Sequence, residues 1–284
     1  MKKTIYLLAA VLLSACGAAP TEAPELKVMS MNMRYDNPED GENNWQYRRE
    51  RIAAMVAGAG VDVMGTQELL GHQYAQLREL LPAYGSVGVG REDGTSGGEH
   101  CAIFYLKERF ELLESGTFWL SEHPEEAGSK GWDGACERIA TWAVLREKGG
   151  RELFFIDTHL DHVGRVARSE GVKLLFDRIA TLGAGRPVVL TGDFNSDPDS
   201  PVIAHVLSDG SLRHARDIAA ECRGAAWSFA DFGQIPEERR PLIDYIFVSR
   251  DFEVPAYEIL PDTFNGGYVS DHAPVTAVLK FADR

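Results

Sequence analysis

The sequence predicts one α/β domain, because strand-like and helix-like segments alternate along a single continuous stretch of chain. The chain has 284 residues, of which 44% are hydrophobic and 25% charged, a balance typical of soluble globular proteins. This composition excludes a disordered chain, a collagen-like fibre and a polytopic membrane protein. A chain of this length fits one large core, and no internal repeat or low-complexity linker follows residue 25.

The first 16 residues have the pattern of a secretory signal and are not expected to fold with the domain. Lys2 and Lys3 precede nine apolar or aromatic residues, 5–13, which are too few to cross the ~30 Å hydrocarbon core of a membrane as a helix. The tetrad Leu-Ser-Ala-Cys that ends at Cys16 is similar to the lipobox of bacterial lipoproteins, in which the cysteine is acylated and becomes the mature N-terminus.

This similarity predicts a lipid-anchored protein of the cell envelope, at the outer membrane or the periplasmic face. Residues 17–25 are small, contain proline and lack a pattern, which suits a flexible tether. The folded domain is then predicted at residues 26–284. A soluble secreted protein with an ordinary cleavage site is the alternative.

The first half of the domain shows two short apolar strands, 26–32 and 61–64, each followed by a helix. The helix between them is indicated by apolar residues at helical spacing and is ended by glycines. These residues are Trp45, Ile52, Met55, Val56 and Ala59, with Gly58 and Gly60. The second helix is indicated by the same spacing at Leu70, Tyr74, Leu77 and Leu81.

The rest of the domain is mostly strand. Further strands are expected at 84–89, 101–106, 117–120, 141–145, 153–160, 187–191, 242–248 and 275–281. An amphipathic helix spans 166–182, and Ser200 followed by Pro201 is typical of a helix start. The loops 91–100 and 121–137 are rich in Gly, Glu and Ser, and we expect them to surround a site.

The charge balance disfavours a general nucleic-acid binder. The formal net charge is -14, and removing the signal takes away two lysines, which leaves -16. Sequence-independent binding of nucleic acid depends on Lys and Arg set against phosphates. Carboxylates that bind a metal would account for part of the acidic surplus, so the sign of the charge alone decides little.

Three cysteines remain after the signal, Cys101, Cys136 and Cys222. They show no CxxC spacing, so a zinc site has no support. In an oxidising compartment one pair can form a disulfide and leave the third thiol free. The sequence does not choose the pair.

Polar residues cluster at the ends of the predicted strands, where packing does not explain them. They are Asn32, Glu68, His159, Asp193, Asn195, Asp244, Asp271 and His272. Carboxylates and amides presented in this way are what a hard divalent cation needs, because Mg²⁺ prefers oxygen ligands. The two histidines suit proton transfer or contact with phosphate better than they suit Mg²⁺.

In this order, the segments resemble the signature blocks of the endonuclease/exonuclease/phosphatase superfamily, whose members are DNase I-like. The blocks cover residues 26 to about 280, and the segments 32–36, 90–94, 118–122 and 157–162 are similar to a bacterial, often lipoprotein, branch near the deadenylase-like members. The resemblance implies a four-layer α/β/β/α sandwich of two packed mixed β-sheets flanked by helices. The site is implied at one edge of the two sheets.

The resemblance also implies a cation site for Mg²⁺ or Mn²⁺. Glu68 would be the principal ligand, with Asn32 beside it and Asp271 completing the site directly or through water. Arg34 is a departure, because abasic-site nucleases carry an aspartate two residues after the matching asparagine. A second metal is therefore doubtful.

The remaining roles implied by the resemblance are catalytic. Asp193 would orient and help deprotonate the attacking water, and Asn195 would hold that water or a phosphate oxygen. His272 would contact the scissile phosphate as acid, base or charge stabiliser. Asp244 would fix the tautomer of His272, and His159 would donate to a non-bridging oxygen.

Each role has a purely structural alternative. Glu68 can be a turn residue, Asp193 and Asn195 can form an Asx-turn, and Asp244 can be the polar start of a strand. His159 with His162 can be a surface pair.

Arginines are the weaker candidates for substrate contact, because most arginines are solvated or paired with carboxylates. Arg34, Arg91, Arg138 and Arg165 are the candidates, since arginine binds phosphate through two parallel hydrogen bonds.

We therefore expect a Mg²⁺- or Mn²⁺-dependent phosphoric-ester hydrolase, a monomer acting outside the cytoplasm on a small or surface-accessible phosphoester. Its metal would activate the phosphate for attack by water. A secreted metal-dependent nuclease is the alternative, disfavoured because no Lys/Arg-rich loop is interleaved with aromatic residues. A catalytically silent binding module is a third possibility, since fold does not guarantee activity.

Overall fold

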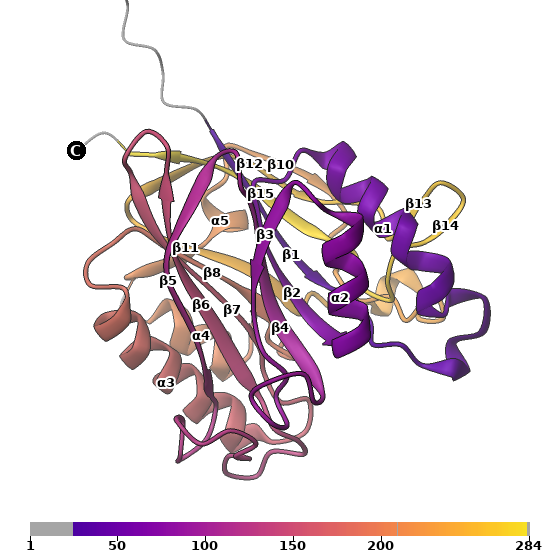
Figure 1. Ribbon diagram of the computed structural model, residues 1–284, viewed down its shortest axis with the longest axis horizontal. Helices are drawn as coiled ribbons and strands as arrows, with labels where there is room; N and C mark the ends of the chain where they lie inside the picture. Colours follow the sequence, from indigo (N-terminus) through magenta and orange to yellow (C-terminus); the bar gives the residue numbers. More distant parts are fainter. Residues whose placement is uncertain (1–24, 209, 283–284) are drawn as a thin grey trace, which may run out of the picture.

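The computed structural model of the chain describes residues 25–208 and 210–282 (Figure 1). The predicted signal, Cys16 with its predicted lipidation, and nearly all of the predicted tether lie outside the described residues. Within the described ranges, no helix is both long enough and apolar enough to span a membrane.

Two mixed β-sheets pack face to face, which confirms the predicted sandwich (Figure 1). In spatial order, the first sheet contains β10 (Glu221–Gly224), β12 (Phe252–Ile259), β15 (Val275–Phe281), β1 (Leu26–Asn32), β2 (Val63–Leu70), β4 (Glu99–Leu106) and β3 (Tyr84–Val87). The second contains β5 (Phe110–Trp119), β6 (Ile139–Glu147), β7 (Glu152–His159), β8 (Val188–Asp193), β11 (Asp244–Ser249) and β9 (Leu212–His214).

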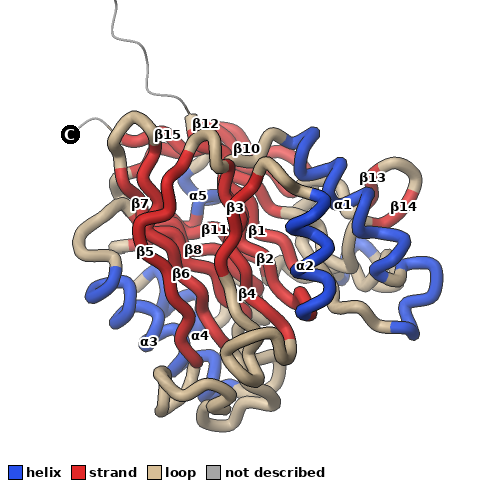
Figure 2. Tube along the Cα trace, viewed as in Figure 1, coloured by secondary structure: helices blue, strands red, loops and turns tan. Residues whose placement is uncertain are grey.

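Helices form the two outer layers (Figure 2). The first sheet is covered by α1 (Trp45–Ala59) and α2 (Gly71–Leu80), and the second by α3 (Arg165–Leu182) and α4 (Pro201–Leu207). The shorter elements are α5 (Ala215–Ile218), the 3₁₀ turns η1 (Pro38–Asn43) and η2 (Glu237–Arg239), and a small hairpin, β13 (Thr263–Phe264) with β14 (Gly267–Tyr268).

The alternation of side chains along β1 explains why the first sheet contributes to a hydrophobic core on each of its two faces. Val28 joins the core between the sheets, whereas its neighbour Met29 joins the core under α1 and α2. Val63 and Met64 divide in the same way on β2. Successive side chains of a strand point to opposite faces, so apolar runs at these positions give a sheet that is covered on both sides.

Helix boundaries follow the sequence signals closely. Gly60 caps α1 in a left-handed conformation, φ 63°, as the predicted stop requires. The Ser200 hydroxyl accepts a hydrogen bond from the Ile203 N–H at 3.3 Å, which confirms the predicted start of α4. Several boundaries were wrong: Leu70 ends β2 and does not begin α2, Leu81 lies just beyond α2, and β5 begins at Phe110, before the predicted start at residue 117.

The sequence did not predict β12, and its proline gives the physical reason. Pro255 cannot donate to a strand ladder, and the register of β12 against β15 shifts between Glu253 and Ala256, which places the proline in a bulge. The open question about a disulfide is also answered, because Cys101, Cys136 and Cys222 are all free thiols.

Candidate active site

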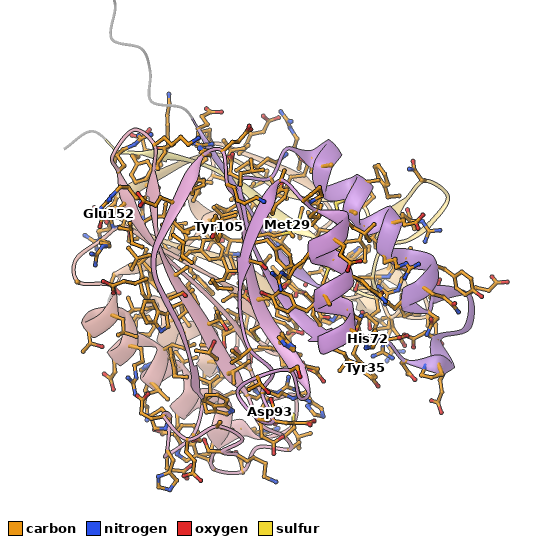
Figure 3. The ribbon with its side chains drawn as sticks, in the orientation of Figure 1. Met29, Tyr35, His72, Asp93, Tyr105 and Glu152 are labelled. Carbon is orange, nitrogen blue, oxygen red and sulfur yellow. The ribbon has the colours of Figure 1, made fainter. Side chains whose placement is uncertain are left out.

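The polar strand ends meet in one pocket of about 450 Å³ at an edge of the sandwich. In Figure 3, Tyr35 and Asp93 lie toward this edge, and Met29 and Tyr105 lie farther up the first sheet. The pocket is lined by Arg34, Tyr35, Glu68, Arg91, Glu99, Cys136, Arg138, His159, His162, Asp193, Asn195, Phe229, Ile243, Asp271 and His272.

Strand direction explains why the catalytic candidates are neighbours. The strands β7 and β8 are parallel, so their final residues, His159 and Asp193, pair with each other. The strand β11 runs antiparallel to β8, so its first residue, Asp244, pairs with the last residue of β8. Three residues that are far apart in the sequence are thereby placed side by side on one sheet.

Glu68 projects into the pocket from a bulge in β2. Two residues of β2, Gln67 and Glu68, face a single residue of β4, Cys101, because the register shifts between Thr66 and Leu69. Glu68 has φ 66°, a left-handed conformation that costs a non-glycine residue stability. Bulges and backbone strain of this kind cluster at functional sites, so the geometry favours the functional reading of Glu68 over an ordinary turn.

Asn32 bridges two carboxylates. Its amide Nδ2 donates to Glu68 Oε1 at 2.9 Å and to Asp193 Oδ2 at 3.1 Å. Its Oδ1 accepts from the Arg34 N–H at 2.9 Å. The amide oxygen thus accepts from the backbone and the amide nitrogen orients the Glu68 carboxylate, while the metal-ligand role of Asn32 stays a prediction.

Asp193 lies between the two histidines of the pocket, His159 and His272. Its Oδ2 is 3.3 Å from His159 Nε2 and 3.9 Å from His272 Nε2. Burial, and then the charge of Asp244, raise the pKa of Asp193 to about 7, although the positive charge of His272 opposes the shift. A carboxylate with a near-neutral pKa suits proton exchange with water.

His272 and Asp244 form the predicted pair. His272 Nδ1 lies 2.8 Å from Asp244 Oδ2, and both side chains are buried. Burial alone would lower the pKa of His272, but the charge and hydrogen bond of Asp244, followed by the charges of Asp271 and Asp193, raise it to about 10. Phe229 packs on the imidazole, with 4.7 Å between ring centroids. His272 is therefore held as a fixed imidazolium.

Asn195 and His159 are neighbouring residues that line the pocket. The Asn195 N–H donates to Asp193 Oδ1 at 2.9 Å, so the Asx-turn alternative is real and also fixes the side chains. Asn195 Nδ2 lies 3.1 Å from His159 Nε2 and 3.0 Å from the Leu160 carbonyl oxygen. Burial, reinforced by the charges of Arg138 and Arg91, holds the pKa of His159 well below its usual value. His159 is therefore neutral.

Glu99 is a pocket residue that sequence reasoning missed. Its Oε2 accepts from Arg91 Nη1 at 2.6 Å and lies 4.0 Å from His159 Nδ1. Burial, then the nearby charge of Glu68, raise the pKa of Glu99 to about 6. No motif marks this glutamate at the start of β4, and only the pairing of β4 with the bulged β2 places it in the pocket.

Three of the four candidate arginines line the pocket. Arg34 makes two hydrogen bonds to Asp40, at 2.9 and 3.0 Å, and Arg138 lies 2.9 Å from His162 Nδ1. The Nε atoms of Arg91 and Arg138 are buried without a hydrogen-bond partner. Arg165 is exposed at the start of α3 and is not a lining residue.

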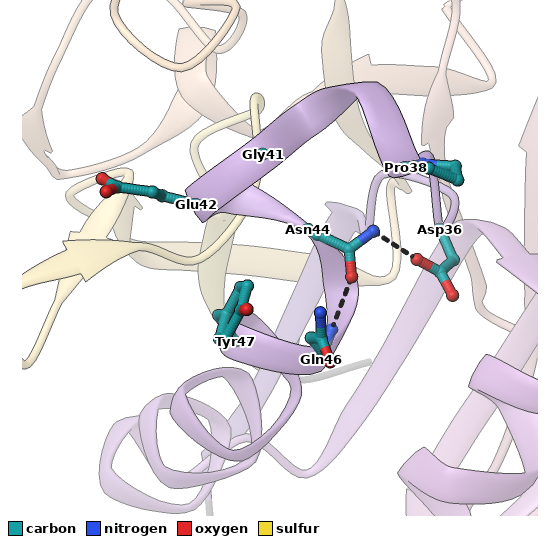
Figure 4. Close-up of a pocket in the computed structure, with 7 residues that line it drawn as sticks. All are labelled: Asp36, Pro38, Gly41, Glu42, Asn44, Gln46 and Tyr47. Carbon is teal, nitrogen blue, oxygen red and sulfur yellow. Dashed lines mark hydrogen bonds between the residues drawn. The ribbon is translucent and has the colours of Figure 1, made fainter.

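A second hollow and a second cluster of ligand atoms are further candidates for a binding site. A broader hollow of about 990 Å³ is lined by Asp36, Pro38, Gly41, Glu42, Asn44, Gln46 and Tyr47 (Figure 4). There Asn44 donates to Asp36 at 2.7 Å and accepts from the Gln46 N–H at 3.3 Å, the geometry of a helix cap. A cluster of Cys136, Asp161 and His162 also brings ligand atoms together.

The donor set of the main pocket fits a hard divalent cation. Ligand atoms of Glu68, His159 and Asp193 lie within 4.8 Å of one another. Glu68 and Asp271 contribute carboxylate oxygens, which Mg²⁺ and Mn²⁺ prefer. The Cys136 cluster fits less well, because both oxygens of Asp161 already accept backbone hydrogen bonds.

Comparison with known proteins shows which family this chain resembles. A model of the Endonuclease/Exonuclease/phosphatase family matches residues 29–272. An endonuclease/exonuclease/phosphatase from Bacteroides vulgatus is 39% identical, with a TM-score of 0.88 over 92% of this chain and 100% of that chain. The mannosyl-6-phosphatase of Bacteroides thetaiotaomicron is 37% identical, with a TM-score of 0.85 over 90% of this chain and 100% of that chain.

The similarity extends to animal proteins. Human nocturnin is 25% identical over 264 residues, which are 81% of this chain and 57% of nocturnin. The chain thus spans little more than half the length of this relative.

Proposed function

This chain belongs to the endonuclease/exonuclease/phosphatase family, and from that premise we propose that it is a divalent-metal-dependent phosphoric-ester hydrolase acting on a small phosphomonoester. The observation that supports this proposal most directly is the position of Asp193. Its carboxylate lies within 4 Å of a ring nitrogen of His159 and of His272, in the pocket that Glu68 and Asp271 also line.

Glu68 and Asp271 would hold the cation. The bound ion would supply Lewis-acid help and charge neutralisation at a phosphate oxygen. Asn32 keeps the Glu68 carboxylate in place from one side, and the Tyr35 N–H, which donates to Glu68 Oε2 at 3.1 Å, does so from the other. Ser270 donates to Asp271 Oδ1 at 3.1 Å.

The other pocket residues would activate the attacking water and stabilise the charge on the phosphate. Asp193 orients the attacking water and accepts its proton, as its pKa near 7 allows. Asn195 holds the water or a phosphate oxygen. His272, kept cationic by Asp244, stabilises the negative charge that grows on the phosphate. Neutral His159 donates a hydrogen bond to a non-bridging oxygen.

The pocket and the relatives support the proposed substrate class. A volume of about 450 Å³ suits a small molecule. Arg34, Arg91 and Arg138 give the pocket local positive charge for a phosphate dianion. The similarity to the mannosyl-6-phosphatase supports a sugar phosphate in particular.

The proposal is tested with a substrate panel on the purified protein. The panel contains mannose 6-phosphate, other sugar phosphates, inositol phosphates, a phosphodiester and single-stranded DNA, each with Mg²⁺, with Mn²⁺ and with EDTA. We expect the highest kcat/KM on a sugar monoester and loss of turnover in EDTA. Activity that survives EDTA would contradict the metal dependence, and a clear preference for DNA would favour the nuclease.

The lipid anchor remains part of the proposal. We propose that Cys16 is acylated and tethers the domain to the envelope, on the basis of the sequence 13–16. Mass spectrometry of the N-terminal peptide from a bacterial host would show the lipid on Cys16, and the Cys16→Ser variant would enter the soluble fraction. An unmodified N-terminus in the wild type would contradict the anchor.

A further inference from the structure

Arg48 is a buried cation on α1 that donates to backbone carbonyls of three separate segments. Its Nε donates to the Asn43 carbonyl at 2.5 Å, its Nη1 to those of Met33 and Val269 at 2.8 and 2.9 Å, and its Nη2 to that of Arg34 at 3.1 Å. The residue is 0% exposed. A buried charge costs stability unless it is well hydrogen-bonded, so the contacts of this side chain call for an explanation.

The carbonyls of Met33 and Arg34 belong to the turn that follows β1. Arg34 has φ 54° in this turn, a left-handed conformation that a non-glycine residue keeps only when its surroundings enforce it. The Arg34 carbonyl accepts a second hydrogen bond, from the buried amide of Gln73 on α2 at 3.1 Å. Side chains from two helices therefore hold the same carbonyl.

This turn orients two residues of the cation site through its N–H groups. The Arg34 N–H donates to Asn32 Oδ1 at 2.9 Å, and the Tyr35 N–H donates to Glu68 Oε2 at 3.1 Å. A turn that relaxed would release both contacts, and the Glu68 carboxylate would lose its fixed orientation.

The Val269 carbonyl, which also accepts from Arg48, lies two residues before Asp271 in the chain. Val269 directly precedes Ser270, whose hydroxyl contacts the Asn32 carbonyl oxygen at 2.7 Å and Asp271 Oδ1 at 3.1 Å. The guanidinium of Arg48 thus links the segment before Asp271 to the turn after Asn32. Arginine suits this task because it presents five donors in a rigid plane.

Resting on the proposed function, we propose that Arg48 is a positioning residue for the cation site, joining the turn that orients Asn32 and Glu68 to the segment that carries Asp271. Residues that hold metal ligands from behind commonly change metal affinity 10–100-fold when they are replaced. A residue that served stability alone would leave the affinity of the folded protein unchanged.

The test is Mn²⁺ affinity, measured by isothermal titration calorimetry on the full-length chain at a temperature where circular dichroism shows each variant folded. We expect Arg48→Met to weaken Mn²⁺ binding about 10–100-fold. Arg48→Lys, which keeps the charge and loses the planar fork, should also weaken binding, about tenfold or more. Gln73→Leu removes the second bond to the Arg34 carbonyl and should weaken binding in the same direction.

Ile52→Ala is the matched control. Ile52 lies one turn farther along α1, is 0% exposed and belongs to the core under the helix. This variant should lower the unfolding temperature while its Mn²⁺ affinity stays within about twofold of wild type, because it removes no carbonyl contact.

The outcomes separate this inference from the function on which it rests. If folded Arg48→Lys, or folded Arg48→Met, binds Mn²⁺ as tightly as wild type, or if Ile52→Ala weakens binding equally, Arg48 has only a structural role and the inference is overturned. If Arg48→Met does not fold, the Lys and Gln73 variants decide in the same way. A wild-type chain that binds no Mn²⁺ overturns the proposed function, and this inference with it.

Discussion

At the scale of single residues, the site combines strained backbone with paired charges. Arg34, Glu68 and Asn195 have positive φ angles of 54°, 66° and 45°, and all three line the pocket. Such conformations persist only where the surrounding structure enforces them. The site is therefore shaped before substrate arrives, which lowers the cost of reaching the transition state.

Asp244→Asn should remove most of the positive charge on His272 at neutral pH. Without the carboxylate, burial is opposed more weakly, and the pKa of His272 should fall from about 10 by roughly 4 units. Since the imidazolium is present only below its pKa, turnover should drop at least ~10²-fold at pH 8 and recover partly at lower pH. The measurement is the pH dependence of kcat together with NMR titration of His272; an unchanged titration would refute the role of Asp244.

Glu99→Gln should lower kcat on the order of tenfold or more. The carboxylate is the partner of Arg91 and lies 4.0 Å from His159 Nδ1, so neutralising it frees Arg91 and removes the negative charge on the Nδ1 side of the imidazole. Glu92→Gln is the control, because Glu92 is exposed in the loop that precedes β4. Steady-state kinetics of the two variants would show whether the difference exists, and equal kcat values would remove Glu99 from the site.

Most site residues could be predicted because chemistry requires particular side chains at strand ends. Glu68, Asp193 and His272 are such residues, and the structure brings them to one pocket. Glu99 could not be predicted, since its place depends on strand pairing. The amide orientation of Asn32 also lay beyond the sequence, because it depends on hydrogen bonds to residues distant in the chain.

At the scale of elements, the two sheets lie so close together near the site that one position on β2 has room only for glycine. A Cβ on Gly65 of β2 would lie 2.1 Å from Asp157 Oδ1 and 2.2 Å from Thr191 Oγ1, two groups of the opposite sheet. Asp157 is itself bonded to Gln67 and Thr191, both at 2.7 Å. Polar side chains thus fill the space between the sheets next to the site.

Gly65→Ala should lower the free energy of unfolding by about 3 kcal/mol or more, because neither sheet can yield to the added methyl group. Gly58→Ala is the matched control: it lies in α1 with nothing within 4 Å of the added Cβ, and should raise stability by about 0.5–1 kcal/mol. Urea unfolding followed by circular dichroism measures both. A neutral Gly65→Ala would mean that the sheets are not in close contact there.

His214 should make stability depend on pH. It ends β9 among Tyr245, Phe247 and Tyr257, and burial lowers its pKa to about 4. Below pH ~6.5, His214 is protonated in the unfolded chain but stays neutral in the folded chain. The free energy of unfolding should therefore decrease as pH falls from about 6.5 to about 4, by at most about 3 kcal/mol.

His214→Phe should remove this part of the pH dependence. The unfolding free energy of the wild type minus that of the variant should decrease steadily as the pH falls from about 6.5 to about 4, because only the wild type loses stability through His214. A difference that is constant with pH would show that His214 does not titrate in this way.

Element positions could be predicted where a periodic pattern and a stop signal coincide, as in α1 with Gly60. They could not be predicted where tertiary pairing overrides local preference. Pro255 in β12 and the continuation of β2 to Leu70 are two examples.

At the scale of the whole molecule, the site exists because two sheets meet at one edge. Asn32 and Glu68 come from the first sheet, and His159, Asp193 and Asp244 come from the second. Neither sheet alone contains both the cation ligands and the acid–base groups. The order of the sequence blocks sufficed to predict this architecture, whereas the substrate depends on the shape of loops that the blocks do not determine.

The central claim is that these distant segments hold a divalent cation at Glu68, and anomalous diffraction from crystals grown with Mn²⁺ tests it most directly. We predict an anomalous peak within bonding distance of the Glu68 carboxylate, in the pocket shared with Asp193 and His272. No peak at Glu68, or a peak only at the cluster of Cys136, Asp161 and His162, would contradict the account.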